Sequence, residues 1–470
     1  MLDILKPGRY INREWNAVHK EWDPRSLKVA LSFPDIYEIG MSHLGLKILY
    51  GILNREKDVV CERVFAPWSD MEKRMRGKKE ILSSIESRKG LRSFDVIGFS
   101  LQNEMSYVDV LNMLDLGGVP VLASERKDSD PLVIAGGPCA FNPEPMAPFI
   151  DAFVIGEAEE AVLEIARVIR GSRLEARDSR DVTLRELSKI DGVYVPALNV
   201  EPGDLKIHRR IVNDLESSFF PTDIVVPYIQ IVHDRISIEI MRGCPHRCRF
   251  CQACKIFYPL RIRSVKRILE IAEESIKNTG YEEISLLSLS TGDYPYLEEL
   301  VKKLEERFKV QGIKISLPSL RASTFKDNGK GQILKKRGIT FAPEAGSDRL
   351  RAYLNKEMTN EEIIKNSNSL LKGGFKKVKL YFMMGLPGEK YEDLDAIIRL
   401  ASQIKSVNLS ISPFIAKPHS EFEKEKMDDL KTLEDKKAYL RSALNAQPSR
   451  RNIKIDFHDL KMSRVEAILA

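Results

Sequence analysis

The sequence lacks the features that define a membrane or secreted protein. No uninterrupted apolar run approaches the roughly 20 residues that a membrane-spanning helix needs. Residues 1–16 contain no apolar core flanked by basic residues, so the sequence indicates no signal peptide. We therefore expect a cytoplasmic protein that does not enter a membrane.

Cysteine is scarce and unevenly placed. Of the six cysteines, four lie between positions 244 and 254, whereas Cys61 and Cys139 stand alone. Such clustering is typical of metal ligands in a reducing compartment rather than of a disulfide framework.

A strong excess of charge is also absent: 74 basic and 68 acidic residues give a net charge of +6, which neither requires nor excludes a polyanionic partner.

The chain has 470 residues, more than one ordinary hydrophobic core accommodates, so we expect two or three domains. Its 43% hydrophobic and 30% charged residues are typical of a soluble globular protein. The pattern along the chain predicts five segments: an N-terminal arm (1–24), a first domain (25–169), a connector (170–228), a second domain (229–440) and a C-terminal extension (441–470).

In the first domain, short apolar strands alternate with amphipathic helices. The predicted strands are residues 28–33, 59–64, 96–101, 132–135 and 152–155, and helical periodicity follows the first and third at 44–53 and 108–114. This alternation predicts an α/β, Rossmann-like doubly wound sheet. Such sheets bind ligands at the carboxyl ends of their strands, where the strand order reverses.

The regions on either side of this domain have weaker patterns. We expect Trp15 and Trp22 of the N-terminal arm to pack on the first domain. Residues 170–228 have no clean period, which predicts a connector of short strands and loops rather than a core.

The second domain repeats a strand–helix unit six times. The predicted strands are residues 236–241, 284–289, 313–317, 339–342, 378–383 and 407–411. The predicted helices are 265–276, which Ser264 would cap, and 297–308, 348–371 and 391–404. Six such units predict a partial (β/α)6 barrel with its chemistry at the carboxyl ends of the strands.

The cysteine cluster follows the first of these strands. Cys244, Cys248 and Cys251 have CxxxCxxC spacing, and three thiolates so close together can bind a 4Fe-4S cluster while one iron keeps no protein ligand. Cys254 adds a fourth thiol, so a structural zinc or a closed cluster is the alternative. Zinc ribbons usually split their cysteines into two separated pairs, and ferredoxin runs end in Cys-Pro, whereas Lys255 follows Cys254.

The motif resembles that of the radical S-adenosylmethionine (SAM) superfamily, CxxxCxΦC, with Phe250 as the aromatic residue Φ. The resemblance implies that Cys244, Cys248 and Cys251 are catalytic metal ligands and that SAM binds the open iron. One electron from a flavodoxin- or ferredoxin-type donor would cleave SAM to a 5′-deoxyadenosyl radical. Cys254 would then be a bystander or a thiol near the cluster rather than a ligand.

The resemblance also assigns residues at later strand ends. Ser290, Gly292 and Asp293 stand where the superfamily has a Gly-Gly-Glu turn for the amino group of SAM, although that turn itself is absent. Glu344 matches a ribose-contacting segment, with a helix N-cap as its alternative role. The residues that match the SAM-cradling turn are Gly385, Gly388 and Glu389. Candidate substrate contacts are Arg321, whose guanidinium could clamp a carboxylate or phosphate, Lys417 and His419.

The predicted Rossmann-like domain that precedes this motif resembles the cobalamin-binding (B12-binding) domain of one subclass of radical SAM proteins. Gly136, Gly137 and Pro138 match its Gly-Gly-Pro turn, and Gly156, Glu157, Glu159 and Glu160 resemble its Gly-x-x-Glu-Glu signature, which implies close approach of the backbone to a corrin or its nucleotide tail. The Asp-x-His-x-x-Gly motif of some cobalamin proteins is absent. The alternatives are a domain that serves only as a docking platform and, for His43, a core histidine.

Three functions remain open from the sequence. The first is a radical SAM enzyme that uses a 4Fe-4S cluster, SAM and cobalamin, for which methyl transfer is the commonest outcome. The second is a methylthiotransferase-like enzyme that modifies RNA, but it lacks the expected second triple-cysteine cluster. Two basic groups could contact the phosphates of the nucleic acid: Arg261, Arg263, Lys266 and Arg267, and Arg450, Arg451 and Lys454. The alternative, which we favour, is that these side chains only form a face exposed to solvent. The third is a non-catalytic iron–sulfur scaffold.

The sequence names neither a substrate nor an oligomeric state. It resembles a group of B12-type radical SAM proteins that often form the front part of a longer fusion. Residues 458–470 break off inside an amphipathic helical pattern, so we expect a truncated or unfused form of such a protein.

Overall fold

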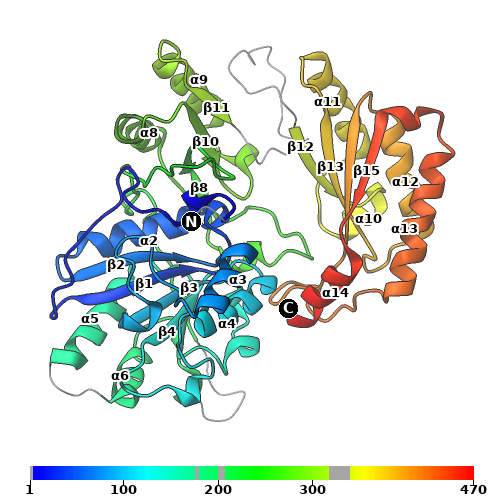
Figure 1. Ribbon diagram of the computed structural model, residues 1–470. Helices are drawn as coiled ribbons and strands as arrows, with labels where there is room; N and C mark the ends of the chain where they lie inside the picture. The colour runs from blue at the N-terminus through cyan, green and yellow to red at the C-terminus, as the bar shows by residue number, and fades with distance from the viewer. Residues whose placement is uncertain (1–3, 175–178, 199–206, 317–338) are drawn as a thin grey trace. The chain divides into compact units, whose positions relative to one another are not determined.

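The computed structural model describes residues 4–174, 179–198, 207–316 and 339–470 (Figure 1). By their internal contacts the residues divide into two units. The first comprises Met1–Asp234 with Glu273–Gly280, and the second comprises Arg235–Ala272 with Tyr281–Ala470. Within the described ranges, no helix is long and apolar enough to cross a membrane.

The first unit is built on a six-stranded sheet. Its strands are β1 (Leu27–Phe33), β2 (Val59–Phe65), β3 (Val96–Ser100), β4 (Leu132–Gly136), β5 (Ala152–Val154) and β6 (Val193–Tyr194). They lie in the order β2-β1-β3-β4-β5-β6, the first five parallel and β6 antiparallel to β5. All five predicted strands and the doubly wound sheet are therefore confirmed. The strand order reverses between β1 and β3, which marks the switch point at which such sheets bind ligands.

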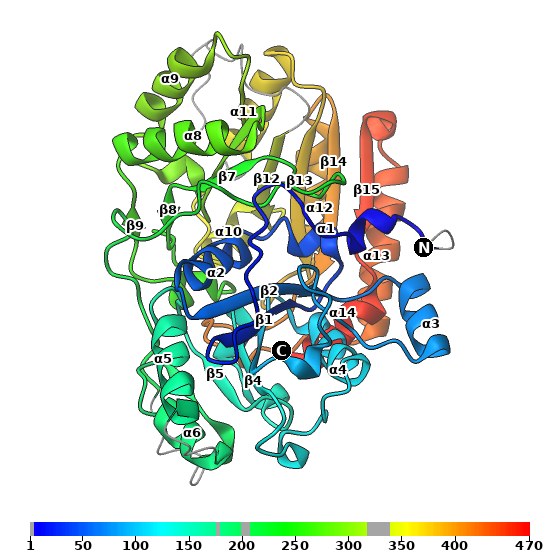
Figure 2. The ribbon, with the colours of Figure 1, turned by 60° about the vertical axis from the view of Figure 1, so that its left-hand side comes forward.

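Helices cover both faces of this sheet. They are α1 (Tyr37–Gly40), α2 (Leu44–Arg55), α3 (Ser69–Lys78), α4 (Tyr107–Leu116), α5 (Ala161–Leu174) and α6 (Arg180–Leu187). Short 3-10 turns lie at Pro7–Tyr10, Leu91–Ser93, Glu104–Ser106, Ala123–Glu125, Pro138–Phe141, Glu144–Met146 and Pro196–Leu198. Helices α2, α5 and α6 share one apolar core with the strands, and α3 and α4 lie on the opposite side (Figures 1 and 2).

The connector contributes to that core, so the prediction of a segment without a core was wrong. Leu187, Val193 and Val225 are almost fully buried, and they pack with residues of the sheet and of α5. These side chains are spaced irregularly along the chain because they come from different elements: Leu187 from α6, Val193 from β6 and Val225 from a loop. They therefore leave no helical or strand period in the sequence.

A buried ionic network fastens the N-terminal arm to the first unit. Arg63 of β2 has a side chain only 2% exposed, and its guanidinium donates to Glu14 (2.5 Å) and to Glu86 (2.6 Å). Trp22 packs on Phe94 as expected. Trp15 does not follow the prediction, because its side chain is 67% exposed.

Among its described residues, the second unit contains the six predicted strands, a further parallel strand and a short two-stranded ribbon. A three-stranded parallel sheet has the order β11-β10-β7, from β7 (Ile236–Glu239), β10 (Glu283–Leu287) and β11 (Lys314–Ser316). A four-stranded parallel sheet joins β12 (Ile339–Glu344), β13 (Val378–Met384), β14 (Val407–Pro413) and β15 (Ile453–Phe457). The two sheets supply the strands of the partial barrel. The sequence analysis missed β15, which lies in the predicted C-terminal extension.

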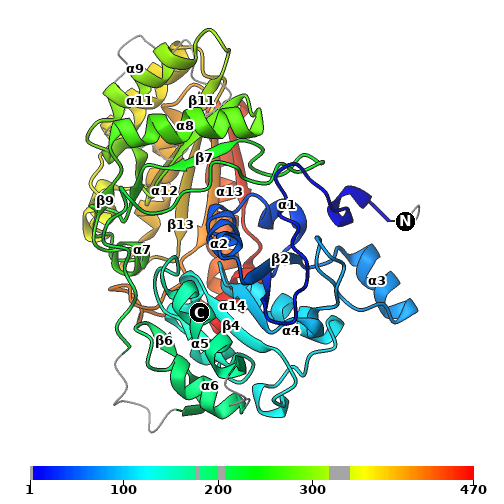
Figure 3. The same ribbon diagram turned by 90° about the vertical axis from the view of Figure 1, so that its left-hand side faces the viewer.

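The described helices of this unit lie between its strands in the chain or after the last of them. They are α7 (Ala253–Ile256), α8 (Val265–Thr279), α9 (Leu297–Phe308), α10 (Asp348–Tyr353), α11 (Asn360–Lys372), α12 (Tyr391–Ser402), α13 (Leu430–Asn445) and α14 (Leu460–Leu469), with 3-10 turns at Thr291–Asp293 and Pro448–Asn452. Helices α8 and α9 lie on one side of the three-stranded sheet (Figures 1 and 3). The predicted cap of α8 is confirmed, because Ser264 Oγ accepts the Arg267 N–H at 3.1 Å.

The single helix predicted over residues 348–371 is wrong, because two helices occupy this range. Helix α10 ends near Asn355, whose φ is 56°, and Thr359 starts α11 with a capping box to Glu362. The fully buried Arg351 holds the break, donating from Nε to the carbonyl of Met358 at 2.9 Å. Apolar periodicity continues through the break, which is why the pattern alone predicts one helix.

We expect Arg63→Met to lower the free energy of unfolding of the first unit by about 3–5 kcal/mol, because two buried carboxylates would lose their cation. The measurement is urea unfolding followed by circular dichroism. Arg25→Met is the matched control, since its ion pair with Asp23 is exposed and its loss should leave the midpoint unchanged. Equal midpoints for wild type and Arg63→Met would contradict the role given to the network.

Candidate active site

The cysteine loop is closed at its base by a two-stranded ribbon. Strands β8 (Met241–Arg242) and β9 (Arg261–Ile262) pair in antiparallel fashion on either side of it. Gly243 follows β8 with a φ of 92°, and a Cβ atom there would lie 2.8 Å from the Phe257 carbonyl oxygen and 2.9 Å from that of Pro259. Only glycine fits this close approach of the two chain segments without a shift of backbone.

Two arginines stabilise the ribbon: Arg261 of β9 and Arg263, which directly follows this strand. Arg261 is 9% exposed and donates from Nε to the Pro259 carbonyl at 3.0 Å, while the fully buried Arg263 donates from Nε to the Glu239 carbonyl at 3.2 Å. The prediction that these two arginines form part of a solvated basic face, or contact phosphates, was wrong. A sequence shows their charge but not the backbone carbonyls that attract them inward.

The middle of the loop is bound to segments that follow two other strands. The Arg249 N–H donates to the Leu354 carbonyl at 3.0 Å, and its own carbonyl accepts the Phe422 N–H at 3.2 Å. Asn355 adds a bond from its side-chain amide to the Arg247 carbonyl at 2.8 Å. The loop therefore rests on residues that follow β12 and β14.

Phe250 contributes apolar packing to this attachment. It packs against a buried cluster at the carboxyl ends of β12, β13 and β14, whose members are Ala345, Leu350, Leu354, Leu386, Phe414 and Phe422. The aromatic residue that precedes the last motif cysteine thus anchors the loop to the strand ends.

The four thiols of the loop lie near one another. Burial raises the pKa of Cys254, and negative charge on Cys251, Cys248 and Cys244 raises it further. Cys254 Sγ donates to the Cys251 carbonyl at 3.2 Å. In the described part of the chain, no three cysteine, histidine or acidic side chains already have the arrangement of a bound metal. The donors themselves, three thiols on one anchored loop, are those that a 4Fe-4S cluster requires.

Asp293 lies beside the cysteine loop. Its carboxylate is 2.8 Å from Nε2 of His246, which stands between the first two motif cysteines, and it accepts a short hydrogen bond from Ser290 Oγ. Gly292 lies in the same 3-10 turn, directly after β10. The residues predicted in place of the Gly-Gly-Glu turn therefore present one carboxylate, which both neighbours hold in place.

Glu344 ends β12 in a strained conformation. Its φ of 69° is rare for a residue with a side chain, and such strain is common at ligand sites. Its carboxylate is 3.3 Å from Nζ of Lys356, and the same Nζ lies 6.0 Å from the ring centroid of Phe250. The alternative role of helix cap does not apply, because Ser347 caps α10 by accepting the Leu350 N–H.

A buried carboxylate, that of Glu389, stabilises the turn that follows β13. Glu389 accepts the Gly385 N–H at 2.8 Å and is paired with Lys436 at 2.7 Å, and its side chain is 2% exposed. Burial raises the pKa of Glu389, while the charge of Lys436 opposes that rise. Gly388, in the same turn, has a φ of 73°. The carboxylate thus shapes the turn through contacts within the chain.

In the first unit, the predicted glycines meet the chain's own backbone. A Cβ at Gly137 would lie 2.6 Å from the Leu101 carbonyl oxygen, and one at Gly156 would lie 2.2 Å from that of Arg210. Gly136 ends β4 and accepts the Leu101 N–H at 2.7 Å, and Pro138 opens the next 3-10 turn. Glu157 accepts the Val212 N–H at 2.7 Å. These residues hold residues 101 and 210–212 at the carboxyl edge of the sheet.

The remaining predicted residues lie apart from these contacts. Lys417 pairs with Glu466 of α14 at 2.9 Å, and His419 has a φ of 64° and donates its N–H to Glu423. Arg321 lies outside the described residues. For all the predicted site residues, ligand contact stays a prediction.

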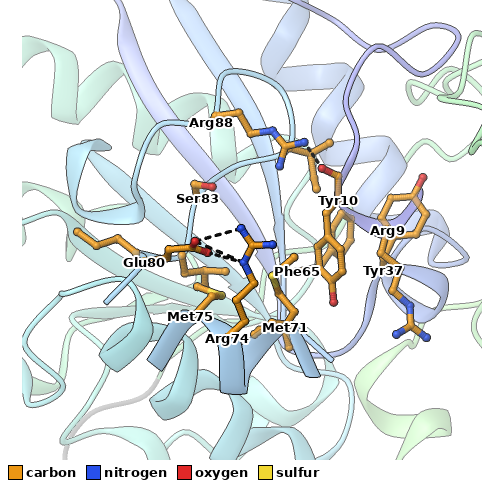
Figure 4. Close-up of a pocket in the computed structure, with 15 residues that line it drawn as sticks. Arg9, Tyr10, Tyr37, Phe65, Met71, Arg74, Met75, Glu80, Ser83 and Arg88 are labelled. Carbon is orange, nitrogen blue, oxygen red and sulfur yellow. Dashed lines mark hydrogen bonds and ion pairs between the residues drawn. The ribbon is translucent and has the colours of Figure 1, made fainter. Parts of the chain in front are cut away.

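A pocket of about 170 Å³ opens elsewhere in the first unit, beside the end of β2 (Figure 4). The labelled side chains show Arg74 bound to Glu80, and Arg88 donating to the Tyr10 carbonyl. None of the predicted site residues lines this pocket, so it is separate from the candidate site.

Sequence reasoning missed three residues of the site. His246, Lys356 and Lys436 each bind a carboxylate of a predicted residue: Asp293, Glu344 and Glu389, respectively. Only His246 could have been predicted as a site residue from the sequence, since it lies within the cysteine motif. The two lysines lie 12 and 47 residues from their partners, so only the folded chain reveals them.

Family comparisons agree with this geometry. Residues 45–196 match the N-terminal domain of radical SAM proteins, and residues 238–401 match the radical SAM superfamily. An uncharacterised protein of Methanocaldococcus jannaschii is 31% identical over 453 residues, which cover 94% of this chain and 88% of that protein. The chain therefore belongs to the radical SAM superfamily, whose members bind a 4Fe-4S cluster and SAM. It is a radical SAM enzyme.

Two further relatives have named functions. Anaerobic magnesium-protoporphyrin IX monomethyl ester cyclase of Rubrivivax gelatinosus is 26% identical over 54% of this chain, and the match spans only 45% of that protein. The structure of the radical SAM methyltransferase TsrM from Kitasatospora setae, with cobalamin and a 4Fe-4S cluster bound, is similar with a TM-score of 0.60. That likeness covers 84% of this chain and 77% of TsrM at 15% identity, so it shows the fold alone.

We expect Gly243→Ala to abolish stable cluster incorporation, because a Cβ atom would push the base of the cysteine loop apart. Iron and sulfide content after anaerobic reconstitution measures this. Gly118→Ala is the control, because Gly118 has a similarly positive φ of 66° but open space around it. Full iron content in Gly243→Ala would contradict the assigned role of the ribbon.

Proposed function

We propose that this chain is a cobalamin-dependent radical SAM enzyme that transfers a methyl group to an unactivated carbon of its substrate. The observation that carries the proposal is the succession of the two units. A parallel sheet of order β2-β1-β3-β4-β5 precedes the cysteine loop, and the fold likeness to a cobalamin-bound methyltransferase extends over 84% of the chain. Cobalamin would bind at the carboxyl edge of the first sheet.

In the second unit, Cys244, Cys248 and Cys251 would hold the cluster. When bound, the cluster and SAM would supply the electron transfer and the 5′-deoxyadenosyl radical, and SAM would supply the methyl group by way of cobalamin. Asp293, which His246 and Ser290 orient, would accept hydrogen bonds from the ammonium group of SAM. Glu344, held by Lys356, would accept a ribose hydroxyl, and the backbone of residues 385–388 would line the same ligand.

In the first unit, we assign the predicted glycines an indirect role. Gly136, Gly137 and Pro138, with Gly156 and Glu157, would shape the edge on which the corrin rests by fixing residues 101 and 210–212. The switch point between β1 and β3 is where the corrin would approach the protein. His43 and Gln102 flank this point as neighbouring side chains.

The electron donor would be a flavodoxin- or ferredoxin-type protein, and the enzyme would work in the cytoplasm. Both proposals rest on the need of radical SAM chemistry for a low-potential electron and for protection of the cluster. Lys417 and His419, which follow β14, and Arg321 remain candidates for contact with the substrate, whose identity the chain does not specify.

The methylthiotransferase-like alternative has less support. It needs a second iron–sulfur cluster, but Cys61 and Cys139 are the only cysteines outside the loop and both are buried, at 1% and 5% exposure. Two of the arginines proposed for RNA contact, Arg261 and Arg263, face backbone carbonyls instead. Arg450, Arg451 and Lys454 are exposed, which agrees with a solvated face.

The direct test is production of 5′-deoxyadenosine after anaerobic reconstitution with iron and sulfide, in the presence of dithionite and SAM. We expect wild type to form the product and Cys248→Ala to fall to background, because its cluster loses one of three ligands. Cys254→Ala is the matched control from the same loop and should keep both iron and activity. Activity in Cys248→Ala, or its loss in Cys254→Ala, would contradict the ligand assignment.

Cobalamin binding has its own measurement. The reconstituted protein is incubated with hydroxocobalamin and desalted, and its corrin absorbance is recorded. We expect about one corrin per chain to remain bound, as for a single ligand site at the sheet edge. Cleavage of SAM without retained corrin would reject cobalamin dependence and leave the radical SAM assignment intact.

A further inference from the structure

Lys47 is a buried cation without a partner in the first unit. It is the fourth residue of α2 and is only 8% exposed. Within the described ranges, its ammonium group makes no hydrogen bond and no ion pair. Lysine is almost never fully buried unless it is paired, because removing the charge from water costs several kcal/mol.

The position of Lys47 points to the carboxyl edge of the sheet. Helix α2 follows β1, and side chains in a helix tilt towards its N-terminus, so Lys47 leans towards the strand ends. His43 caps this helix, with Nδ1 accepting the Leu46 N–H at 3.2 Å. Burial lowers the pKa of His43 to about 4, and the charge of Lys47 contributes to that lowering, so the two groups are neighbours.

The side chains around Lys47 come from both sides of the switch point between β1 and β3. Gln102, whose side chain neighbours that of His43, follows β3, whereas His43 follows β1. The opposite charge that acts on Lys47 is that of Asp234, just beyond the predicted connector. The backbone N–H of His233 donates to Ser42 Oγ at 2.9 Å, which brings this exposed segment beside the start of α2.

The titration of Lys47 agrees with this environment. Burial lowers its pKa to about 8, and attraction by Asp234 only partly opposes the shift. The ammonium group is therefore still charged at pH 7, inside the protein and without a hydrogen-bonded anion. A perturbed group at a ligand-binding edge is characteristic of functional sites.

We propose that Lys47 binds the phosphodiester in the nucleotide tail of cobalamin. The inference rests on the proposed function and names a specific contact within it. The corrin ring of cobalamin carries neutral amides, and its phosphodiester is the one anionic group among its side chains. A buried ammonium group satisfies such an anion through a short, charge-assisted hydrogen bond. Lys47 would thus select complete cobalamin over corrins that lack the tail.

Cobinamide, which has the corrin ring but no nucleotide tail, provides the test. The cluster-reconstituted full chain is titrated with hydroxocobalamin and, separately, with cobinamide, and binding is followed by equilibrium dialysis and corrin absorbance. We expect Lys47→Met to weaken cobalamin binding about 10- to 100-fold and to change cobinamide binding by less than about 2-fold. Lys47→Arg should retain the preference, and Lys57→Met, an exposed lysine just beyond α2, should match wild type.

The outcomes separate the two proposals. If wild type retains neither corrin, cobalamin dependence itself is rejected. If wild type binds cobalamin but Lys47→Met weakens both corrins equally, or neither, the phosphodiester contact is rejected while the proposed function stands.

Thermal unfolding of the corrin-free protein gives a second readout, independent of binding. At pH 7, Lys47→Met should raise the melting temperature, because an unpaired buried charge is replaced by an apolar side chain of similar size. The folded pKa of about 8 lies below the unfolded value of 10.5, so wild type alone should gain stability as the pH rises between them. A lower melting temperature in Lys47→Met would indicate a structural ion pair, with Asp234 as partner, and would overturn the proposal.

Discussion

The close approach of two backbone segments at the base of the cysteine loop is the constraint on which the second unit depends. Gly243 lets β8 and the segment before β9 come together, and Arg261 satisfies the carbonyls that this approach buries. Hydrogen bonds from Arg249 then fix the middle of the loop to residues that follow β12 and β14. Three thiols on a loop held at its base and middle lose little further freedom when a cluster binds, which favours tight binding.

The carboxylates around this loop follow one principle, since each is oriented by a neighbour before any ligand arrives. Asp293 is held by His246, Glu344 by Lys356, and Glu389 by Lys436 together with the Gly385 N–H. Preorganised acceptors bind a cation or a hydroxyl without a further ordering cost. The first unit differs. Gly137 and Gly156 admit the chain's own backbone, and among its described residues Lys47 is a buried charge that makes no ion pair.

Much of this could be predicted from the sequence, because apolar strands and cysteine spacing are local signals. All eleven predicted strands form, and the motif cysteines lie together near one strand end. Features set by distant contacts could not be predicted. The break between α10 and α11 depends on Arg351, the burial of Arg261 and Arg263 depends on loop carbonyls, and the connector joins the core through isolated side chains. His246 and Lys356 became visible as site residues only when folding brought their carboxylate partners beside them.

We propose that three thiolates of one anchored loop leave an iron open for SAM. This can be measured by electron-nuclear double resonance of the reduced protein with SAM carrying ¹⁵N in its amino group and ¹⁷O in its carboxylate. We expect hyperfine couplings from both labels, in wild type and equally in Cys254→Ala. A spectrum without either coupling, or couplings that appear only after Cys254 is removed, would mean that a fourth thiolate closes the cluster, and would overturn the assignment of an open iron.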